Sequence, residues 1–159
     1  MSDKRDTLDN LDADLADSDL AAATLLLVDD NQQNLELMQA WLEPLGCTLE
    51  VAHDGAEALE VAGRSHPDLV LLDVMMPRMS GFEACRRLKD APATRDTVII
   101  MVTALNEVGD FERAVECGCD DFLTKPVNKL ELTTRVKSLL RVRLLKRKVE
   151  ALLRERRQG

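Results

Sequence analysis

The stretch DLVLLDVMMPRMSGFEA, residues 68–84, decides the fold because it joins a buried strand to a turn and then to a helix. Residues 69–72 are all apolar, which predicts a strand with both faces buried. The strand ends at the carboxylate of Asp73, and Pro77 and Gly81 then turn the chain into the helical pattern that follows. A carboxylate delivered by a buried strand marks this strand end as a candidate functional site.

Similar units repeat along the chain. The apolar runs are residues 25–28, 49–52, 69–72, 98–102 and 122–123. Amphipathic segments with helical spacing separate these runs. Strands that alternate with helices predict a doubly wound α/β fold, in which a parallel sheet lies between two layers of helices. We expect one domain with five βα units in residues 23–140.

The N-terminal segment differs in composition from this domain. Residues 1–22 are rich in aspartate and contain no aromatic residue, so we expect an acidic, disordered tail. The whole chain has 159 residues, a net charge of −8 and a pI of about 4.8. This acidity argues against binding to nucleic acid.

The C-terminal segment has a helical pattern from about residue 129 to about residue 156. Its apolar spacing changes phase between Leu139 and Val142. We therefore expect the first part to pack on its own domain, while residues 141–159 form a helical extension that acts as a coiled coil or a linker. A solvated basic helix with no partner is the simpler alternative.

Several classes of protein are disfavoured. No apolar run reaches the length of a membrane span, and the N-terminus lacks the order of a secretory signal. The four cysteines do not follow the spacing of a disulfide scaffold, so we expect a cytoplasmic protein with reduced thiols. Cys117 and Cys119 have no histidine near them in sequence, which argues against a metal site there.

Polar side chains stand where four of the predicted strands end. Asp29 and Asp30 follow the first strand, Asp73 the third, Thr103 the fourth and Lys125 the fifth. Each one alone could be a helix cap or an ordinary strand end. Because the carboxyl ends of parallel strands share one edge, where open α/β sheets bind ligands, the five side chains are expected to converge.

The chemistry of this set is consistent with phosphoryl transfer. Clustered carboxylates repel one another unless a divalent cation lies among them, and oxygen ligands with phosphate-bearing partners suit Mg²⁺. A lysine and a threonine hydroxyl stabilise phosphoryl oxygens, while a carboxylate can be the nucleophile. The sequence therefore predicts Mg²⁺ as cofactor.

Four segments in order, LLLVDDNQQNLELMQAWLEPLG, PDLVLLDVMMPRMSGFEACRRLK, VIIMVTALNE and GCDDFLTKP, resemble the receiver domain of two-component response regulators. The resemblance covers about residues 24–140. It implies a flavodoxin-like (βα)5 fold with strand order 2-1-3-4-5. It also implies a phosphorylation switch and not an enzyme, with no chemistry beyond its own phosphorylation and dephosphorylation.

The resemblance implies a role for each site residue. Asp73 is expected to accept the phosphoryl group from a histidine kinase, a phosphotransfer protein or a small donor. Asp30 is expected to bind Mg²⁺ directly, Asp29 directly or through water, and the backbone carbonyl of Met75 is expected to be a further ligand, with Asp73 completing the set.

The resemblance also implies a switch. Thr103 and Lys125 are expected to bind the aspartyl phosphate, and Phe122 matches the aromatic residue that turns inward on activation. The fourth helix, fifth strand and fifth helix, which we call the switch face, commonly form a two-fold dimer. Pro126 matches a proline that commonly follows a cis bond. Met75 and Leu105 cannot orient a water, so we expect slow dephosphorylation.

The C-terminal segment leaves the output open. It resembles helices that join a receiver to an output domain, especially in regulators resembling cyclic-dinucleotide synthases and hydrolases, yet none of their catalytic motifs appears before Gly159. Two interpretations follow. The chain is a stand-alone regulator that dimerises through its last helix or through the switch face, or it is the front of a longer protein. An Mg²⁺-dependent phosphatase of the aspartyl-phosphate type is a rival, disfavoured because Met75 stands where that class needs a second aspartate.

Overall fold

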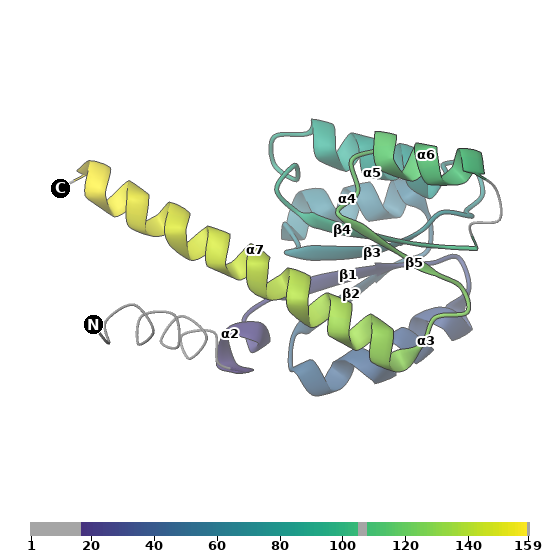
Figure 1. Ribbon diagram of the computed structural model, residues 1–159, viewed down its shortest axis with the longest axis horizontal. Helices are drawn as coiled ribbons and strands as arrows, with labels where there is room; N and C mark the ends of the chain where they lie inside the picture. Colours follow the sequence, from purple (N-terminus) through teal and green to yellow (C-terminus); the bar gives the residue numbers. More distant parts are fainter. Residues whose placement is uncertain (1–16, 105–107, 159) are drawn as a thin grey trace.

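The computed structural model describes residues 17–104 and 108–158. A five-stranded parallel sheet of order β2-β1-β3-β4-β5 lies between two layers of helices, with α3 and α7 on one face and α4, α5 and α6 on the other (Figure 1). The strands are β1 (Thr24–Val28), β2 (Thr48–Ala52), β3 (Leu69–Asp73), β4 (Val98–Thr103) and β5 (Asp121–Thr124). The helices are α2 (Asp17–Ala21), α3 (Gln32–Leu42), the 3₁₀ turn η1 (Glu43–Leu45), α4 (Gly55–Ser65), α5 (Gly81–Asp90), α6 (Val108–Glu116) and α7 (Lys129–Gln158). The predicted fold and strand order are confirmed.

The central strands are apolar at nearly every position because each face of the sheet has its own core. On β3, Leu69 and Leu71 pack with α3 and α7, whereas Val70 and Leu72 pack with α4 and α5. All five residues of β3 are buried, including Asp73. Alternate side chains of a strand point to opposite faces, so a strand covered on both sides shows no alternation in sequence.

The N-terminal boundary differs from the sequence prediction. Residues 17–21 form α2, and Leu20 of this helix is buried in the core that α3 and α7 cover. Asp19 lies 3.4 Å from Lys148 of α7. The folded part therefore begins before Ala23, because a single leucine anchors an otherwise acidic segment. Residues 1–16, the rest of the expected tail, lie outside the described residues.

The helix α7 also stays on the domain longer than expected. Its buried residues, Leu132, Val136, Leu140 and Leu144, recur every four positions. Packing therefore continues past residue 140, where we placed the end of the domain. The large apolar residues that α7 exposes are Leu130, Val142, Val149, Leu152 and Leu153. Among residues 17–104 and 108–158, no helix has both the length and the apolar character needed to cross a membrane.

Candidate functional site

Three carboxylates meet at the carboxyl edge of the sheet. The strands β1 and β3 pair in parallel with Val28 opposite Leu72, so their next residues emerge side by side. Asp29, Asp30 and Asp73 each place a carboxylate oxygen within 4.8 Å of the other two. Asp29 and Asp73 are 2% exposed, and Asp30 lies at the surface.

Asp29 is oriented by the start of the helix that follows it. Its Oδ1 accepts a hydrogen bond from the backbone N–H of Asn31 at 2.9 Å, and its Oδ2 accepts one from the side-chain amide of Asn34 at 3.3 Å. Asn31, not an aspartate, caps α3 by accepting hydrogen bonds from the N–H groups of Gln33 and Asn34. The cap of α3 is thus supplied by Asn31 and not by Asp29 or Asp30. Sequence reasoning missed Asn34, although its place in the first turn of α3 was a usable signal.

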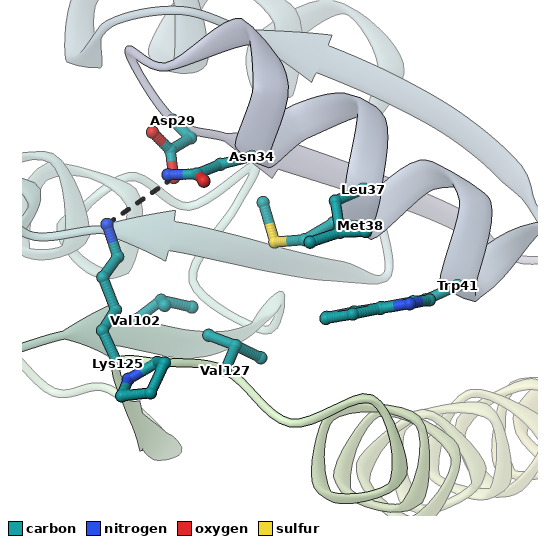
Figure 2. A pocket seen from close by; sticks show the side chains of 9 residues that line it. Asp29, Asn34, Leu37, Met38, Trp41, Val102, Lys125 and Val127 are labelled. Carbon is teal, nitrogen blue, oxygen red and sulfur yellow. Dashed lines mark hydrogen bonds and ion pairs between the residues drawn. The ribbon is translucent and has the colours of Figure 1, made fainter.

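Lys125 lies between the two buried carboxylates. Its Nζ is 3.2 Å from Oδ1 of Asp73 and 3.7 Å from Oδ2 of Asp29. Figure 2 shows Lys125 reaching from the end of β5 toward Asp29, which follows β1, and Asn34 on α3. One ammonium group therefore faces two buried carboxylates, and a third carboxylate lies nearby.

The charge of Asp73 is incompletely compensated. Burial raises the pKa of this carboxyl above its ordinary value, and repulsion by Asp29 raises it further. Lys125 and the hydrogen bond from the Met75 N–H, 3.3 Å from Oδ1, act in the opposite direction but do not cancel these effects. A cation among the three carboxylates would favour the ionised form.

Thr103 reaches the same edge from the neighbouring strands. β4 and β5 pair with Thr103 opposite Thr124, and the N–H of Lys125 donates to the Thr103 carbonyl at 2.8 Å. Thr103 is buried and lines an opening of about 340 Å³ together with Asp30 and Met75. The structure thus brings all five predicted side chains to one edge of the sheet.

The loop after Asp73 is held tightly against its own strand. The N–H of Gly81 donates to the Val74 carbonyl at 3.0 Å. A Cβ at Gly81 would overlap the backbone of Asp73 and Val74. The site therefore requires glycine at this position because no side chain fits between the helix α5 and the strand end.

The predicted switch residue Phe122 lies half-buried on β5. Its ring contacts the ring of Phe111 on α6 edge-to-face, with 5.0 Å between centroids and 86° between planes. Phe111 is 49% exposed, so this pair lies at the surface of α6 and β5. The Lys125–Pro126 peptide bond is cis. Leu105 lies outside the described residues.

A second cavity, of about 200 Å³, opens beside the site between α3 and residues 125–127, which follow β5 (Figure 2). Asp29 and Lys125 form its polar end, and its apolar wall includes Leu37, Trp41 and Val127. Leu37 is 48% exposed, so the cavity continues into an apolar surface next to the carboxylates.

Comparison with known proteins places the chain in a family. Residues 25–137 match the model of the response regulator receiver domain. The response regulator PleD of Caulobacter vibrioides is 45% identical over 124 residues, which are 78% of this chain and 27% of PleD. The chain therefore belongs to the response regulator receiver domain family, the receivers of two-component systems. It spans about a quarter of the length of PleD.

Solved structures agree with this assignment. The receiver domain of a signal transduction histidine kinase from Syntrophus aciditrophicus has a TM-score of 0.71 at 39% identity, over 75% of this chain and 90% of that chain. The receiver domain of a sensor histidine kinase from Pseudomonas aeruginosa has a TM-score of 0.69 at 31% identity, over 75% and 98% of the two chains. In that crystal structure a magnesium ion is coordinated in the active-site cleft.

Proposed function

We propose that this chain is a phosphorylation switch in which Asp73 accepts a phosphoryl group from a histidine kinase or a phosphotransfer protein. The observation that carries this proposal is the contact of Lys125 with Asp73 beside two further carboxylates. A buried carboxylate with a raised pKa, next to one lysine and an opening to solvent, is suited to react and not merely to stabilise the fold.

Mg²⁺ fits the donor set. Asp29, Asp30 and Asp73 offer three oxygens within 4.8 Å of one another, and hard oxygen ligands with room for water suit this ion. The backbone carbonyl of Met75 is a further proposed ligand. When bound, the ion supplies positive charge for the carboxylates and the phosphoryl oxygens. The magnesium seen in the related receiver from Pseudomonas aeruginosa supports this choice.

The residues of the chain have separate roles in the transfer. A carboxylate oxygen of Asp73 attacks phosphorus, the bond to the donor breaks, and an acyl phosphate remains on Asp73. Lys125 is placed to neutralise one phosphoryl oxygen, and the hydroxyl of Thr103 to donate a hydrogen bond to another. Because Met75 is apolar and 73% exposed, it cannot orient a water, and we propose slow loss of the phosphoryl group.

The switch face consists of α6, β5 and α7. Movement of Thr103 toward the phosphoryl group would change the space behind it, and Phe122 would follow. Phe122 has no hydroxyl, so it acts through packing, and its contact with Phe111 couples β5 directly to α6. The phosphoryl group thus biases a two-state surface.

We further propose that a second copy covers the far part of α7. The exposed residues Val142, Val149 and Leu152 follow the three- and four-residue steps of a heptad when taken with Leu145 between them. In this proposal residues 17–148 form the folded unit, and residues 149–158 extend from it as a helix. The front of a longer protein stays an alternative, because the chain matches only part of PleD.

Intact-mass measurement after incubation with acetyl phosphate and Mg²⁺ tests the phosphoryl transfer. The wild type should gain one phosphoryl group per chain, and a chelator should prevent the gain. Asp73→Asn should gain none. Asp68→Asn, which changes a buried aspartate at the other end of β3, should still be phosphorylated. Labelling of Asp73→Asn, or continued turnover of a phosphoester as in the rival phosphatase, would overturn the proposal.

Light scattering tests the proposed dimer. Beryllofluoride with Mg²⁺ should raise the mass of the wild type but leave that of Asp73→Asn unchanged if the switch face controls association. A dimer present in every state, and lost when residues 149–159 are removed, is the result expected if the far part of α7 alone holds the two copies together. A monomer throughout would contradict both versions.

A further inference from the structure

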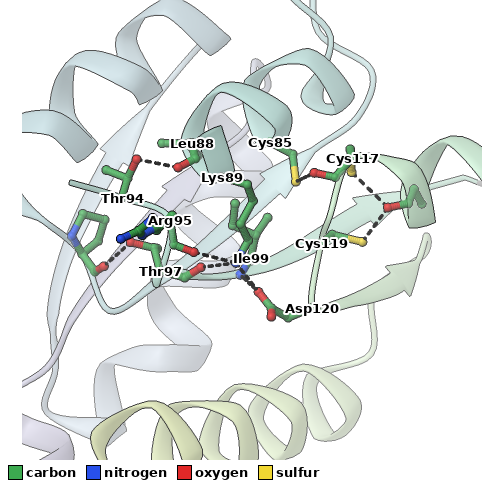
Figure 3. Close-up of polar contacts among 12 residues, drawn as sticks. Cys85, Leu88, Lys89, Thr94, Arg95, Thr97, Ile99, Cys117, Cys119 and Asp120 are labelled. Carbon is green, nitrogen blue, oxygen red and sulfur yellow. Dashed lines mark hydrogen bonds and ion pairs between the residues drawn. The ribbon is translucent and has the colours of Figure 1, made fainter. Parts of the chain in front are cut away.

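Three thiols cluster where α5, α6 and β5 meet, away from the carboxylates. Figure 3 shows Cys85, Cys117 and Cys119 close together. The Sγ of Cys85 on α5 donates to the carbonyl of Cys117 at 3.4 Å. Cys85 is completely buried, Cys117 is 3% exposed and Cys119 is partly exposed. The cluster therefore has one side that reaches solvent, at Cys119.

Two of the thiols share a single acceptor. The carbonyl oxygen of Ala114 accepts hydrogen bonds from the Sγ of Cys117 at 3.0 Å and from the Sγ of Cys119 at 3.1 Å. Gly118 between them has a φ of +84°, which turns the chain so that both side chains face the end of α6. A disulfide needs a Cα–Cα distance of about 4.4–6.8 Å, and a turn at the intervening residue brings the two Cα atoms closer than the roughly 7 Å of an extended chain.

The backbone on the other side of the pair is anchored. Asp120, the neighbour of Cys119, accepts hydrogen bonds on Oδ2 from the N–H of Ile99 at 2.8 Å and from Nζ of Lys89 at 2.9 Å (Figure 3). Cys117 is fixed by its own N–H, which donates to the Arg113 carbonyl at 3.0 Å. The two thiols are thus held as neighbours by both flanks.

The thiols differ in acidity. The neighbouring thiols of Cys119 and Cys85 lower the pKa of Cys117, because their S–H groups can turn from their carbonyl acceptors to donate to its thiolate. The same contact, together with burial, raises the pKa of Cys119. The first proton therefore leaves from Cys117, and the thiolate is the form of cysteine that reacts with oxidants.

We propose that Cys117 and Cys119 form a reversible disulfide within one chain when the protein meets a peroxide. This goes beyond the phosphorylation switch, because it is a second modification site with its own chemistry. Cys85 is a positioning residue, since its S–H on α5 donates to the backbone carbonyl of Cys117.

The reaction balances with hydrogen peroxide as the oxidant. The Cys117 thiolate attacks one peroxide oxygen, the O–O bond breaks, and Cys117 sulfenic acid and hydroxide form. The thiol of Cys119 then attacks the sulfenic sulfur, the S–O bond breaks, and water leaves with the proton of Cys119. The hydroxide takes up the proton that Cys117 lost on ionisation, so one peroxide oxidises two thiols and yields two waters.

The disulfide would change the end of α6. The Ala114 carbonyl belongs to the last turn of this helix, where carbonyls lack partners within the helix. The N–H of Gly118 donates to Val115, and that of Cys117 donates to Arg113, so neither replaces the two S–H donors. Oxidation removes both donors from Ala114 and is therefore expected to loosen the last turn of α6, the helix that carries Phe111 of the switch face.

Peptide mapping of the whole chain tests the disulfide. The reduced protein is treated at low concentration with hydrogen peroxide, alkylated and digested with trypsin. Arg113 and Lys129 bound one peptide that contains Cys117 and Cys119, because the bond before Pro126 resists trypsin. We expect this peptide to be unalkylated and lighter by two hydrogens, and a reductant should reverse the change.

Serine variants provide the controls. Cys119→Ser and Cys117→Ser keep a hydroxyl donor for Ala114 but cannot form the bond, so neither should show the change. Cys47→Ser, which alters a thiol packed against the other core, should behave as the wild type. Disulfides that involve Cys85 or Cys47, disulfides between two copies, sulfinic or sulfonic acids alone, or intact thiols would each overturn the proposal.

Hydrogen exchange measures the effect on α6. Oxidation of the wild type should speed amide exchange in the last turn of α6 about fivefold or more, as expected for the loss of one net hydrogen bond. The same peroxide treatment of Cys119→Ser should leave this exchange unchanged. Unchanged exchange in a wild type whose disulfide is proven would contradict the link to α6 but not the modification.

Discussion

β3 carries a buried aspartate at each end, and the two have opposite surroundings. Asp68, which directly precedes the strand and is 5% exposed, accepts hydrogen bonds from the Thr24 N–H at 3.0 Å and from the Arg147 guanidinium at 2.5 Å. Asp73 at the other end is 2% exposed and faces other carboxylates, with Lys125 as its cationic partner. Both aspartates are thus buried, but only the charge of Asp68 is fully compensated by its partners.

The difference separates a structural carboxylate from a reactive one. Burying a carboxylate is costly unless hydrogen bonds and an opposite charge replace the lost water. Asp68 has both hydrogen bonds and an opposite charge. Its partner Arg147 is half exposed, so the guanidinium stays partly solvated. Asp73 has a raised pKa because its protein partners replace the lost water only in part. Incomplete compensation, and not burial, therefore marks the functional end of the strand.

The largest expected effect is on the backbone that holds Asp73 in place. Gly81→Ala should lower the free energy of unfolding by about 2–4 kcal/mol, because the added methyl overlaps the backbone of Asp73 and Val74. Urea denaturation measures the loss. Gly63→Ala is the matched control, since no atom lies within 4 Å of a Cβ placed there, and it should stabilise helix α4 by about 0.5–1 kcal/mol. Equal stabilities for both variants would show that the close approach of α5 to the end of β3 does not require glycine at position 81.

The next effect concerns the structural aspartate. Asp68→Ala should lower the free energy of unfolding by about 1–3 kcal/mol, because the N–H of Thr24 and the guanidinium of Arg147 both lose their acceptor. Urea denaturation of this variant, of Arg147→Ala and of the double variant forms a cycle. We expect a coupling of about 1 kcal/mol, since Arg147 is half exposed. Strict additivity would show that the pair contributes nothing.

The reactive aspartate should give a change of opposite sign. In metal-free buffer at neutral pH, Asp73→Asn should raise the free energy of unfolding by about 0.5–1.5 kcal/mol, because it removes a buried charge that Asp29 repels. Thermal and urea denaturation measure the change. A loss of stability as large as that of Asp68→Ala would mean that Lys125 compensates Asp73 fully.

The smallest effect is the pH dependence of that difference. Unfolded Asp73 titrates near 3.8, and folded Asp73 titrates above this value. Between these two pKa values the folded state holds the extra proton, so stability due to neutral Asp73 is full below 3.8 and is lost as the pH rises through the folded pKa. The advantage of Asp73→Asn over wild type should therefore grow across this window and stay level above it.

Denaturation at a series of pH values in the presence of a chelator measures this curve. Adding Mg²⁺ should flatten it in the wild type, because a bound cation favours ionised Asp73. Asp73→Asn should show no such response in this window. A constant difference between the two proteins at all pH values would contradict a raised pKa.

The sequence predicted the strands of the sheet well, because buried strands appear as runs of consecutive apolar residues. All five predicted runs end within a residue of the observed strands. The runs in β1, β3 and β4 are continuously apolar because both faces of these strands are covered. The convergence of Asp29, Asp30 and Asp73 followed from the strand ends alone, since parallel strands share one carboxyl edge.

The remaining features depend on packing that no local pattern encodes. Arg147 meets Asp68 across 79 positions of sequence because α7 passes the amino end of β3. Leu20 anchors α2, yet its neighbours are acidic, so composition predicted a tail. The thiol cluster likewise depends on Cys85 of α5, whose approach to Cys117 requires the packed structure.

The helix α7 is one uninterrupted rod of 30 residues, about 45 Å long at 1.5 Å per residue. Its first turns lie by the carboxylates, while Arg147 and Lys148 hold it at the opposite edge of the sheet through Asp68 and Asp19. Between these ends Leu132, Val136, Leu140 and Leu144 are buried in the core, so this length of the helix is fixed to the domain. The direction in which residues 149–158 project is therefore set by the receiver core, and a partner bound to that tip would be held at a fixed orientation to the carboxylates.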